Sequence, residues 1–338
     1  MDFFPYNTDA AIELVDSLST NLQAKSPVEL SLNPCHSRHY SSLPHVIGGY
    51  YKSRETSIEE SRKALDNANE KIQHSLCQNI GMDSGPEYHL FAIDVTPNKR
   101  PYAKKLADKG FVHINETVTG KKPVAIGHKY SCVAYITQEK HWALPLSLNR
   151  VKTSEKDTVY GVTQWCSIIK DPSNGFGNKK SIGLFDSAYS NAFSITQLIL
   201  QTKGMEDKVI FIARLRGDRV LMRPTHQVLT GRKGRPAFFD TGRPFRLDDA
   251  TTWEKPQNST TVPWVTSRKK EHTVEINVWT DLRMRGHREC PIQTVPLTVI
   301  RIAVKHQKDG SKVYQHPLWP LNLLLVNPVL LSINLPLS

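Results

Sequence analysis

The stretch HLFAIDVT, residues 89–96, is a short apolar run that presents one carboxylate, Asp94, near its end. The following Pro97-Asn98 should stop a strand, because proline cannot donate a backbone hydrogen bond. A second run of this kind, SIGLFDS at residues 181–187, carries Asp186 near its carboxyl end. The sequence therefore predicts two buried strands that each present an aspartate, and we interpret the pair as two halves of one metal site.

The order of the surrounding segments would bring the two aspartates together. In chain order we predict strands at 122–136 and 142–151, a helix at 154–170 with Ser154 as N-cap, a helix at 190–202 and a strand at 208–214. If the first three strands form a meander and the Asp186 strand lies parallel beside the Asp94 strand, both aspartates reach the same edge of the sheet.

Two carboxylates on rigid strands suit a hard divalent cation. Mg²⁺ prefers oxygen ligands and keeps several waters, so two or three carboxylates are enough for a site. Two such ions about 3.5–4 Å apart can activate a water and stabilise the leaving oxygen of a phosphodiester. Asp94 and Asp186 are the predicted ligands of Mg²⁺ or Mn²⁺. The spacing alone leaves a simpler role open, because an aspartate after a strand often caps the next helix.

The composition of the 338-residue chain favours an anionic partner. A formal net charge of +12 and a sequence pI near 9.4 point to nucleic acid first and to an anionic membrane surface second. Five cysteines without short spacing argue against a disulfide framework and fit a reducing cytoplasm. We expect no secretory signal, and no membrane-spanning helix because prolines interrupt the apolar tail at 317–338.

A basic stretch begins where the last predicted core strand ends. Residues 214–246 contain nine arginines or lysines and two aspartates. Because an arginine fork donates two parallel hydrogen bonds to phosphate, we predict contact with the DNA backbone. A solvated surface loop is the alternative. The residues assigned to DNA binding are Arg214, Arg216, Arg219, Arg232, Lys233, Arg235 and Arg243.

The helical pattern disappears between residues 217 and 305, which predicts a mostly β insertion. Its strand-like runs lie at 220–223, 272–280 and 296–304. Trp253 and Trp264 in this region could stack on an exposed base, although packing within the insertion is the favoured interpretation.

Other polar groups have less specific patterns. Four basic residues after the Asp94 strand either approach phosphate or form a solvated loop; they are Lys99, Arg100, Lys104 and Lys105. Two groups of residues have a spacing that is compatible with a zinc site, although neither contains a CxxC pair. They are Cys35 with His36 and His39, and His287 with Cys290. His128 and His141 are expected to pack within strands. No nucleotide-binding loop or hydrolase motif is present.

Five sequence words carry a resemblance to a known family. They are FAIDVT (91–96), KPVAIGHKYS (122–131), GLFDSAY (183–189), FIARLRGDRV (211–220) and HPLW (316–319). These words are similar to those of DDE-superfamily transposases of bacterial insertion sequences, specifically an IS4/IS701-like group of cyanobacterial type. The resemblance implies an α/β fold with an RNase H-like mixed sheet, in which Asp94 and Asp186 are the first two acidic positions. It also implies Mg²⁺ or Mn²⁺ as cofactor, DNA as partner, a homodimer on the DNA, and a cytoplasmic, nucleoid-associated bacterial protein.

The chain departs from the family pattern at the third acidic position. That residue, usually a glutamate on a helix after the insertion, should follow Trp319, yet residues 320–338 contain no aspartate or glutamate. This composition predicts a truncated or frameshifted end, and hence a decayed transposase that keeps two of three ligands. Asp248, Asp249 and Glu254 in the insertion are the candidates for a substitute.

The first part of the chain is predicted to be a small helical module that binds DNA or joins subunits. Its expected helices span 8–24, with Asp9 as N-cap, and 57–78. The predicted domains are the helical module at 1–85, the first part of an RNase H-like core at 86–216, the basic β-rich insertion at 217–305 and a truncated end of the core at 306–338.

The predicted function is that of a transposase that performs metal-dependent DNA cleavage and strand transfer at insertion-sequence ends. The alternative is a catalytically inactive DNA-binding remnant of a transposase, which would still occupy DNA ends.

Overall fold

The structure is a computed structural model that describes residues 7–24, 26–51, 58–81, 87–100, 102, 105, 107–114, 123–137, 143–225, 239–266, 268–306, 310–314 and 318–322. The chain forms two compact units, Met1–Ile80 and Gly81–Ser338. Within the described ranges, the first unit consists of helices, and all the strands belong to the second.

The first unit is helical. Its helices are α1 (Thr8–Ser19), α2 (Pro27–Leu30), α3 (Ser42–Tyr51) and α4 (Ile58–Gly81). The two predicted helices are confirmed as α1 and α4, but α1 ends at Ser19 and begins after Asn7 rather than Asp9. Ala10, Ala11 and Val46 form a small core in which α1 packs against α3. α2 and α3 were not predicted from the sequence.

The second unit contains a mixed sheet. Its first six strands are β1 (Tyr88–Lys99), β2 (Gly110–His113), β3 (Val124–Ile136), β4 (Ala143–Val151), β5 (Lys180–Phe185) and β6 (Val209–Arg214). β1, β3 and β4 form an antiparallel meander, β5 lies parallel beside β1, and β6 lies parallel beside β5. This is the predicted α/β fold with an RNase H-like mixed sheet. The short β2 pairs with the beginning of β3 and was not predicted.

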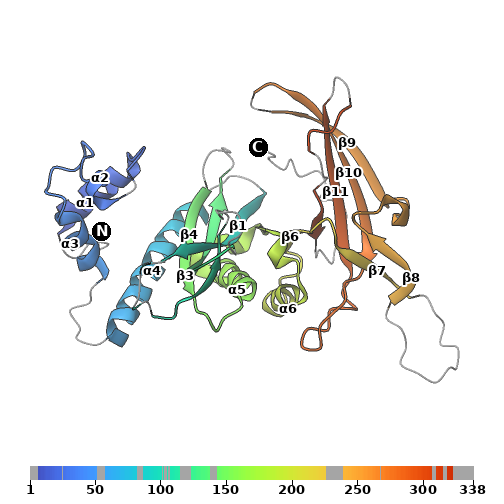
Figure 1. The fold of residues 1–338 in the computed structure, drawn as a ribbon, viewed down its shortest axis with the longest axis horizontal. Coiled ribbons are helices and arrows are strands. Elements are labelled where there is room, and N and C mark those ends of the chain that lie inside the picture. Colours follow the sequence, from blue (N-terminus) through green and yellow to red (C-terminus); the bar gives the residue numbers. More distant parts are fainter. Residues whose placement is uncertain are drawn as a thin grey trace. The chain divides into compact units, whose positions relative to one another are not determined.

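Two helices follow the strands in the expected order, α5 (Asp157–Lys170) after β4 and α6 (Ala192–Gln201) after β5. α5 packs on β1 and β3 and also contacts α6 (Figure 1). Lys156 rather than Ser154 is the N-cap of α5. The fully buried Trp165 of α5 packs against Phe91 of β1 and Phe185 of β5. Three 3₁₀ turns complete this region: η1 (Pro172–Asn174), η2 (Phe176–Asn178) and η3 (Ser187–Tyr189).

β1 continues to Lys99, so the prediction that Pro97-Asn98 would end the strand is wrong. The Arg100 amide donates a hydrogen bond to the Ile126 carbonyl of β3. Because the direction of hydrogen bonding alternates along a strand, the ring nitrogen of Pro97 points away from β3. β5 pairs with β1 only as far as Ile93. The missing N–H of Pro97 therefore removes no hydrogen bond to β3 or β5.

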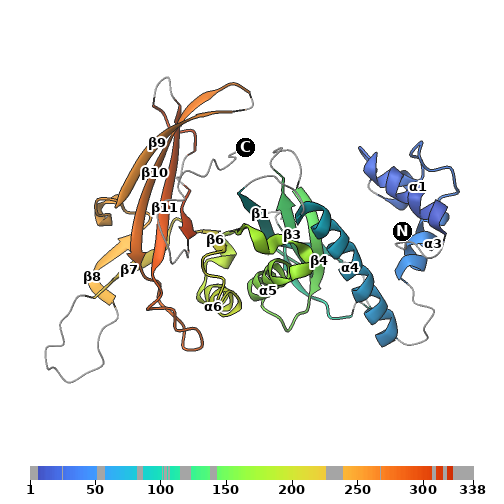
Figure 2. The ribbon, with the colours of Figure 1, turned by 180° about the vertical axis from the view of Figure 1, so that it is seen from behind.

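The β-rich region contains β7 (Val220–Pro224), β8 (Phe239–Arg246), β9 (Asn258–Val265), β10 (Glu271–Leu282), β11 (Leu297–His306) and β12 (Pro320–Asn322), with the 3₁₀ turn η4 (Ala250–Thr252). β7, β10 and β11 confirm the three predicted runs, whereas β8, β9 and β12 were not predicted. β7 and β8 form a separate two-stranded sheet beside β10 (Figures 1 and 2). β12 pairs with both β6 and β11, so the core strands and β9–β11 belong to one ten-stranded sheet.

Aromatic side chains fill the interior of the β-rich region. The Trp253 ring lies 5.2 Å from Trp319 and 6.0 Å from Trp279, and the fully buried Phe245 packs on Trp279. The Trp253 Nε1 also donates to the Arg246 carbonyl at 2.6 Å. Trp264 packs on His272. These contacts agree with the packing interpretation of both tryptophans rather than with base stacking.

All five cysteines are free. No helix in the described part of the chain is long and apolar enough to cross a membrane.

Candidate metal centre and its surroundings

Asp94 and Asp186 lie side by side at one edge of the sheet. The last paired residues of the parallel strands β1 and β5 are Ile93 and Phe185, and each aspartate is the next residue in its chain. Neighbouring strands are about 4.8 Å apart, so the two carboxylates leave adjacent strands at the same level. Both residues are exposed, and neither forms an ion pair with another described residue. The order of elements had predicted this proximity.

Asp186 also shapes the turn that follows β5. Its carboxylate accepts a hydrogen bond from the Ala188 amide at 2.9 Å and caps η3. Asn191 then caps α6 through the Ser194 amide and reaches Thr158 at the start of α5. The capping role that the sequence left open is therefore present. It occupies one carboxylate oxygen with a backbone donor and is compatible with a cation on the other.

Tyr189 is buried beside the two aspartates. Burial raises the pKa of its phenol, and the negative charges of Asp94, Asp186 and Asp157 raise that pKa further. A Cβ on Gly161 of α5 would lie 2.5 Å from the Tyr189 hydroxyl oxygen, so only glycine allows α5 to approach this closely. The phenol therefore stays protonated at neutral pH.

Asp157 was not singled out from the sequence. It lies in the first turn of α5, and its carboxylate accepts a hydrogen bond from the Lys129 ammonium of β3 at 2.6 Å. The only local signal was an acidic residue at a helix start, which ordinarily indicates favourable interaction with the helix dipole. The contact with Lys129 joins residues 28 positions apart, and a periodic pattern cannot reveal it.

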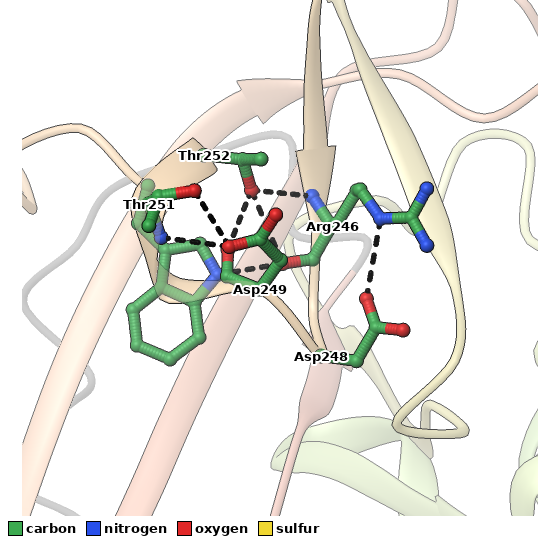
Figure 3. A network of polar contacts seen from close by, with 6 residues as sticks. Arg246, Asp248, Asp249, Thr251 and Thr252 are labelled. Carbon is green, nitrogen blue, oxygen red and sulfur yellow. Dashed lines mark hydrogen bonds and ion pairs between the residues drawn. The ribbon is translucent and has the colours of Figure 1, made fainter.

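The candidate substitutes for the third acidic residue have other partners. Asp249 accepts hydrogen bonds from the amide and hydroxyl of Thr251, which hold its pKa below the usual value, and Asp248 pairs with Arg246 (Figure 3). Glu254 pairs with Arg223 at 2.9 Å. Within the described ranges, no three histidine, cysteine or acidic side chains are close enough together to hold one ion.

The basic residues at the end of β6 lie close to the aspartate edge. Arg219 donates to the carbonyl of Ser190, four residues after Asp186, at 3.4 Å. Arg214 and Arg216 are exposed. Arg243, in β8, is exposed and lies 3.8 Å from Glu254. The predicted DNA-binding residues Arg232, Lys233 and Arg235 lie outside the described residues.

A turn of the β-rich region contacts α6. The His287 ring lies 5.1 Å from the Phe193 ring, and the Lys156 ammonium lies 3.3 Å from the centre of the same ring. The turn is closed by backbone hydrogen bonds between His287 and Cys290. This contact places Lys156 and the turn close to the α6 N-cap that follows Asp186.

The remaining polar groups have local roles. His128 binds the Ala107 carbonyl through Nε2 at 2.8 Å, as expected for a packed strand histidine. His36 is buried near Glu13 and Ser42, without a third zinc ligand among the described side chains. Lys99, Arg100 and Lys105 are exposed. Lys104 and His141 lie outside the described residues.

The donor set at the aspartate edge fits a hard divalent cation. Two carboxylates on adjacent strand ends supply oxygen ligands, and water completes the shell that Mg²⁺ prefers. The buried hydroxyls of Tyr189 and Ser131 interact with each other, and this side-chain hydrogen bond partly offsets the rise in the pKa of Tyr189.

Comparisons with known proteins identify the family of the chain. The model of a family described as "DDE superfamily endonuclease" matches residues 2–277. The solved structure of the NurA nuclease from Sulfolobus solfataricus is 9% identical, covers 81% of this chain and 80% of its own, and has a TM-score of 0.30, too low to support an argument. No curated protein matches the chain.

Proposed function

Because the chain belongs to the DDE superfamily endonuclease family, we propose that it is a transposase that cleaves DNA at the ends of an insertion sequence and joins those ends to a target. The observation that carries this proposal is the placement of Asp94 and Asp186, exposed and adjacent at the ends of two parallel strands. Rigid strand ends are suited to holding ligands in a fixed geometry.

The residues at this edge have complementary tasks. Asp94 and Asp186 would hold Mg²⁺ or Mn²⁺, which supplies an activated water and stabilises the leaving oxygen of the phosphodiester. Arg214, Arg216 and Arg219 would bind the phosphates that flank the scissile bond, because arginine donates two parallel hydrogen bonds to phosphate. Lys156 adds a positive charge beside Phe193. A homodimer on the DNA would present one such site to each end.

A strand-transfer assay tests the proposal. The full chain is incubated with a linear DNA that carries the element's ends, a supercoiled plasmid and either Mg²⁺ or Mn²⁺. Joined products support the transposase. Cleavage without joining would show an endonuclease that does not transfer strands. DNA binding without any product would favour a DNA-binding remnant without catalytic activity.

The second candidate is a DNA-binding remnant without catalytic activity. It is favoured by one observation, that no group of three potential ligands is found in the described ranges. Titration with Mn²⁺ in a calorimeter separates the two, because a remnant that lacks a functional site should bind DNA without measurable metal affinity.

The arginines at the end of β6 give a prediction about salt. A triple variant in which alanine replaces Arg214, Arg216 and Arg219 should bind DNA more weakly. The slope of log K against log[salt] should fall in magnitude by roughly 2–3, because each lost phosphate contact lowers the magnitude of this slope by about 0.9. Fluorescence anisotropy at several salt concentrations measures this slope.

The matched control removes three cations elsewhere, by replacing Arg268, Lys269 and Lys270 between β9 and β10. An equal change of slope in both triple variants would show that only net charge matters, and would contradict the assignment.

A further inference from the structure

Three exposed apolar side chains lie together on the paired strands β2 and β3. Phe111 of β2 is 77% exposed, and Ile126, directly opposite it on β3, is 41% exposed. Val124, two residues before Ile126 and on the same face, is 45% exposed. Val112 of β2 faces the core, with 1% exposure, so the Phe111 ring is not needed to fill the core. Because an apolar edge strand favours aggregation, these side chains indicate a binding surface.

The segment around these side chains is strongly basic. Residues 97–130 contain eight lysines or arginines and two acidic residues, a net charge of +6 and half of the +12 of the whole chain. The exposed cations among the described residues include Lys99, Arg100 and Lys105. Tyr102, in the same segment, and Phe111 are the two most exposed aromatic side chains in the described part of the chain.

This combination of charge and apolar surface favours one class of partner. Lysines are depleted in surfaces that bind other proteins. Aromatic side chains interleaved with cations are instead typical of surfaces that bind single-stranded nucleic acid, where the cations contact phosphates and the rings stack on bases.

The backbone that carries Phe111 is held in place on both sides. A Cβ at Gly127 of β3 would lie 2.1 Å from the Asn98 carbonyl oxygen, so only glycine allows β1 to approach β3 this closely. Just before β2, the Asp108 carboxylate accepts hydrogen bonds from the Thr153 amide at 3.2 Å and from Arg150 at 3.1 Å. A surface fixed in this way loses little conformational freedom when it binds a partner.

The exposed apolar side chains lie on the same face of the sheet as Asp94. Asp94 pairs with Cys132 of β3, and Ile126 is six residues from Cys132. Because side chains separated by an even number of residues on a strand share a face, Asp94, Ile126 and Phe111 point to the same side. At about 3.3 Å per residue, Phe111 lies about 20 Å along the strands from Asp94. This distance corresponds to about six nucleotides of DNA.

We propose that Phe111, Ile126 and Val124 form a stacking platform for an unpaired base of the DNA strand that passes the aspartate edge. The cations of residues 97–130 bind the phosphates of that strand. This inference rests on the proposed function, which supplies DNA as the nucleic acid. An unpaired base has a free flat face, whereas both faces of a base inside a duplex are already covered by its neighbours. The platform should therefore favour single-stranded over duplex DNA, with little dependence on sequence.

Fluorescence anisotropy of the full chain tests this inference, with a short labelled single strand and with the duplex of the same sequence. Phe111→Ala should weaken single-strand binding by about fivefold or more, the scale of one base stacked on an aromatic ring. Duplex binding should stay within about twofold, and the salt dependence should be unchanged, because no cation is lost. Phe111→Trp should retain the affinity for the single strand, whereas Phe111→Leu, which is apolar but has no ring, should lose most of it.

A fluorescent base gives a second readout of stacking. The emission of 2-aminopurine is quenched when the base stacks, so a single strand that contains it should lose emission on binding to the wild-type chain. The loss should be smaller with Phe111→Ala at saturating protein. Thermal melting of each variant checks that the fold is retained.

Tyr314→Ala is the matched control, because Tyr314 is another exposed aromatic residue, at 51%, and lies outside the basic segment. Equal losses in the two alanine variants, or an unchanged single-strand affinity in Phe111→Ala, would overturn the inference. So would a wild-type chain that binds no single strand. A change in oligomeric state with unchanged DNA affinity in Phe111→Ala would assign the platform to a second copy of the chain instead.

The outcomes for the platform and for the proposed function are separate. If the wild-type chain joins DNA ends and Phe111→Ala binds the single strand as the wild type does, only the platform fails. If single-strand binding depends on Phe111 but the strand-transfer assay gives no product, the transposase fails and the platform is retained.

Discussion

Replacing either Asp94 or Asp186 with asparagine should reduce metal-dependent DNA cleavage by about 100-fold or more. Replacing a group that only hydrogen-bonds to a metal ligand already lowers metal affinity or activity by about 10–100-fold. Asp94 and Asp186 would themselves be direct ligands. The asparagine side chain has the same shape but lacks the negative charge that holds a cation. The rate of plasmid nicking at fixed Mg²⁺ measures the effect.

The same variants should keep the full stability of the fold. Both aspartates are exposed, and they lie next to each other on parallel strands without a cation from the described residues. Like charges at neighbouring strand positions repel, so a single asparagine should leave the melting temperature unchanged or slightly raised. Loss of activity together with retained stability is typical of a site optimised for function.

Asp207→Asn is the matched control for these variants. Asp207 is an exposed aspartate just before β6, at the opposite end of the strands. Its replacement should leave nicking within about twofold of the wild type. Retention of most of the activity in Asp94→Asn, under conditions where this control is also active, would remove the basis for the proposed metal centre.

Trp165→Ala should cause the largest loss of stability in the RNase H-like core. Removing a buried tryptophan costs about 3–5 kcal/mol of unfolding free energy, because the transfer energy is lost and a cavity remains. Trp165 is fully buried, and its ring centre lies 5.5 Å from that of Phe185. The total free energy of unfolding of a domain is only about 5–15 kcal/mol. Unfolding in urea, followed by circular dichroism, measures the change.

Two controls accompany this variant. Trp165→Phe should cost less, since it keeps an aromatic ring and removes an indole N–H that has no partner among the described atoms. Phe111→Ala, at a side chain that is 77% exposed, should change the unfolding free energy by less than about 0.5 kcal/mol. A small effect of Trp165→Ala would mean that the ring does not support β5, and that Asp186 is positioned by other contacts.

The sequence predicted those elements whose residues follow a simple pattern. β1 and β5 were recognisable as apolar runs that present an aspartate, and the order of strands and helices was enough to place Asp94 beside Asp186. β9 was missed because seven of its eight residues are exposed, so no alternation of apolar and polar residues marks it. α2 has four residues, too few for a helical period.

The candidate site was predictable only in part. Asp94 and Asp186 each have a local signal, but the pairing of Asp157 with Lys129 depends on how α5 packs on β3. Likewise, the burial of Tyr189 depends on a glycine in a different element. Such relations arise from tertiary packing, and neither hydrophobic periodicity nor residue type contains them.

The three-residue strand β12 has a consequence for folding. It pairs on one side with β6 and on the other with β11, although those strands lie at residues 209–214 and 297–306. The pairing of β12 with β6 closes a long loop, so it should be a slow, late step of folding. The pairing with β11 is local, because Leu318 already bridges Ile302. Until β12 docks on β6, the backbone of β6 is an open sheet edge that can capture strands of other chains. The chain is therefore most prone to aggregation during synthesis in the interval before β12 docks.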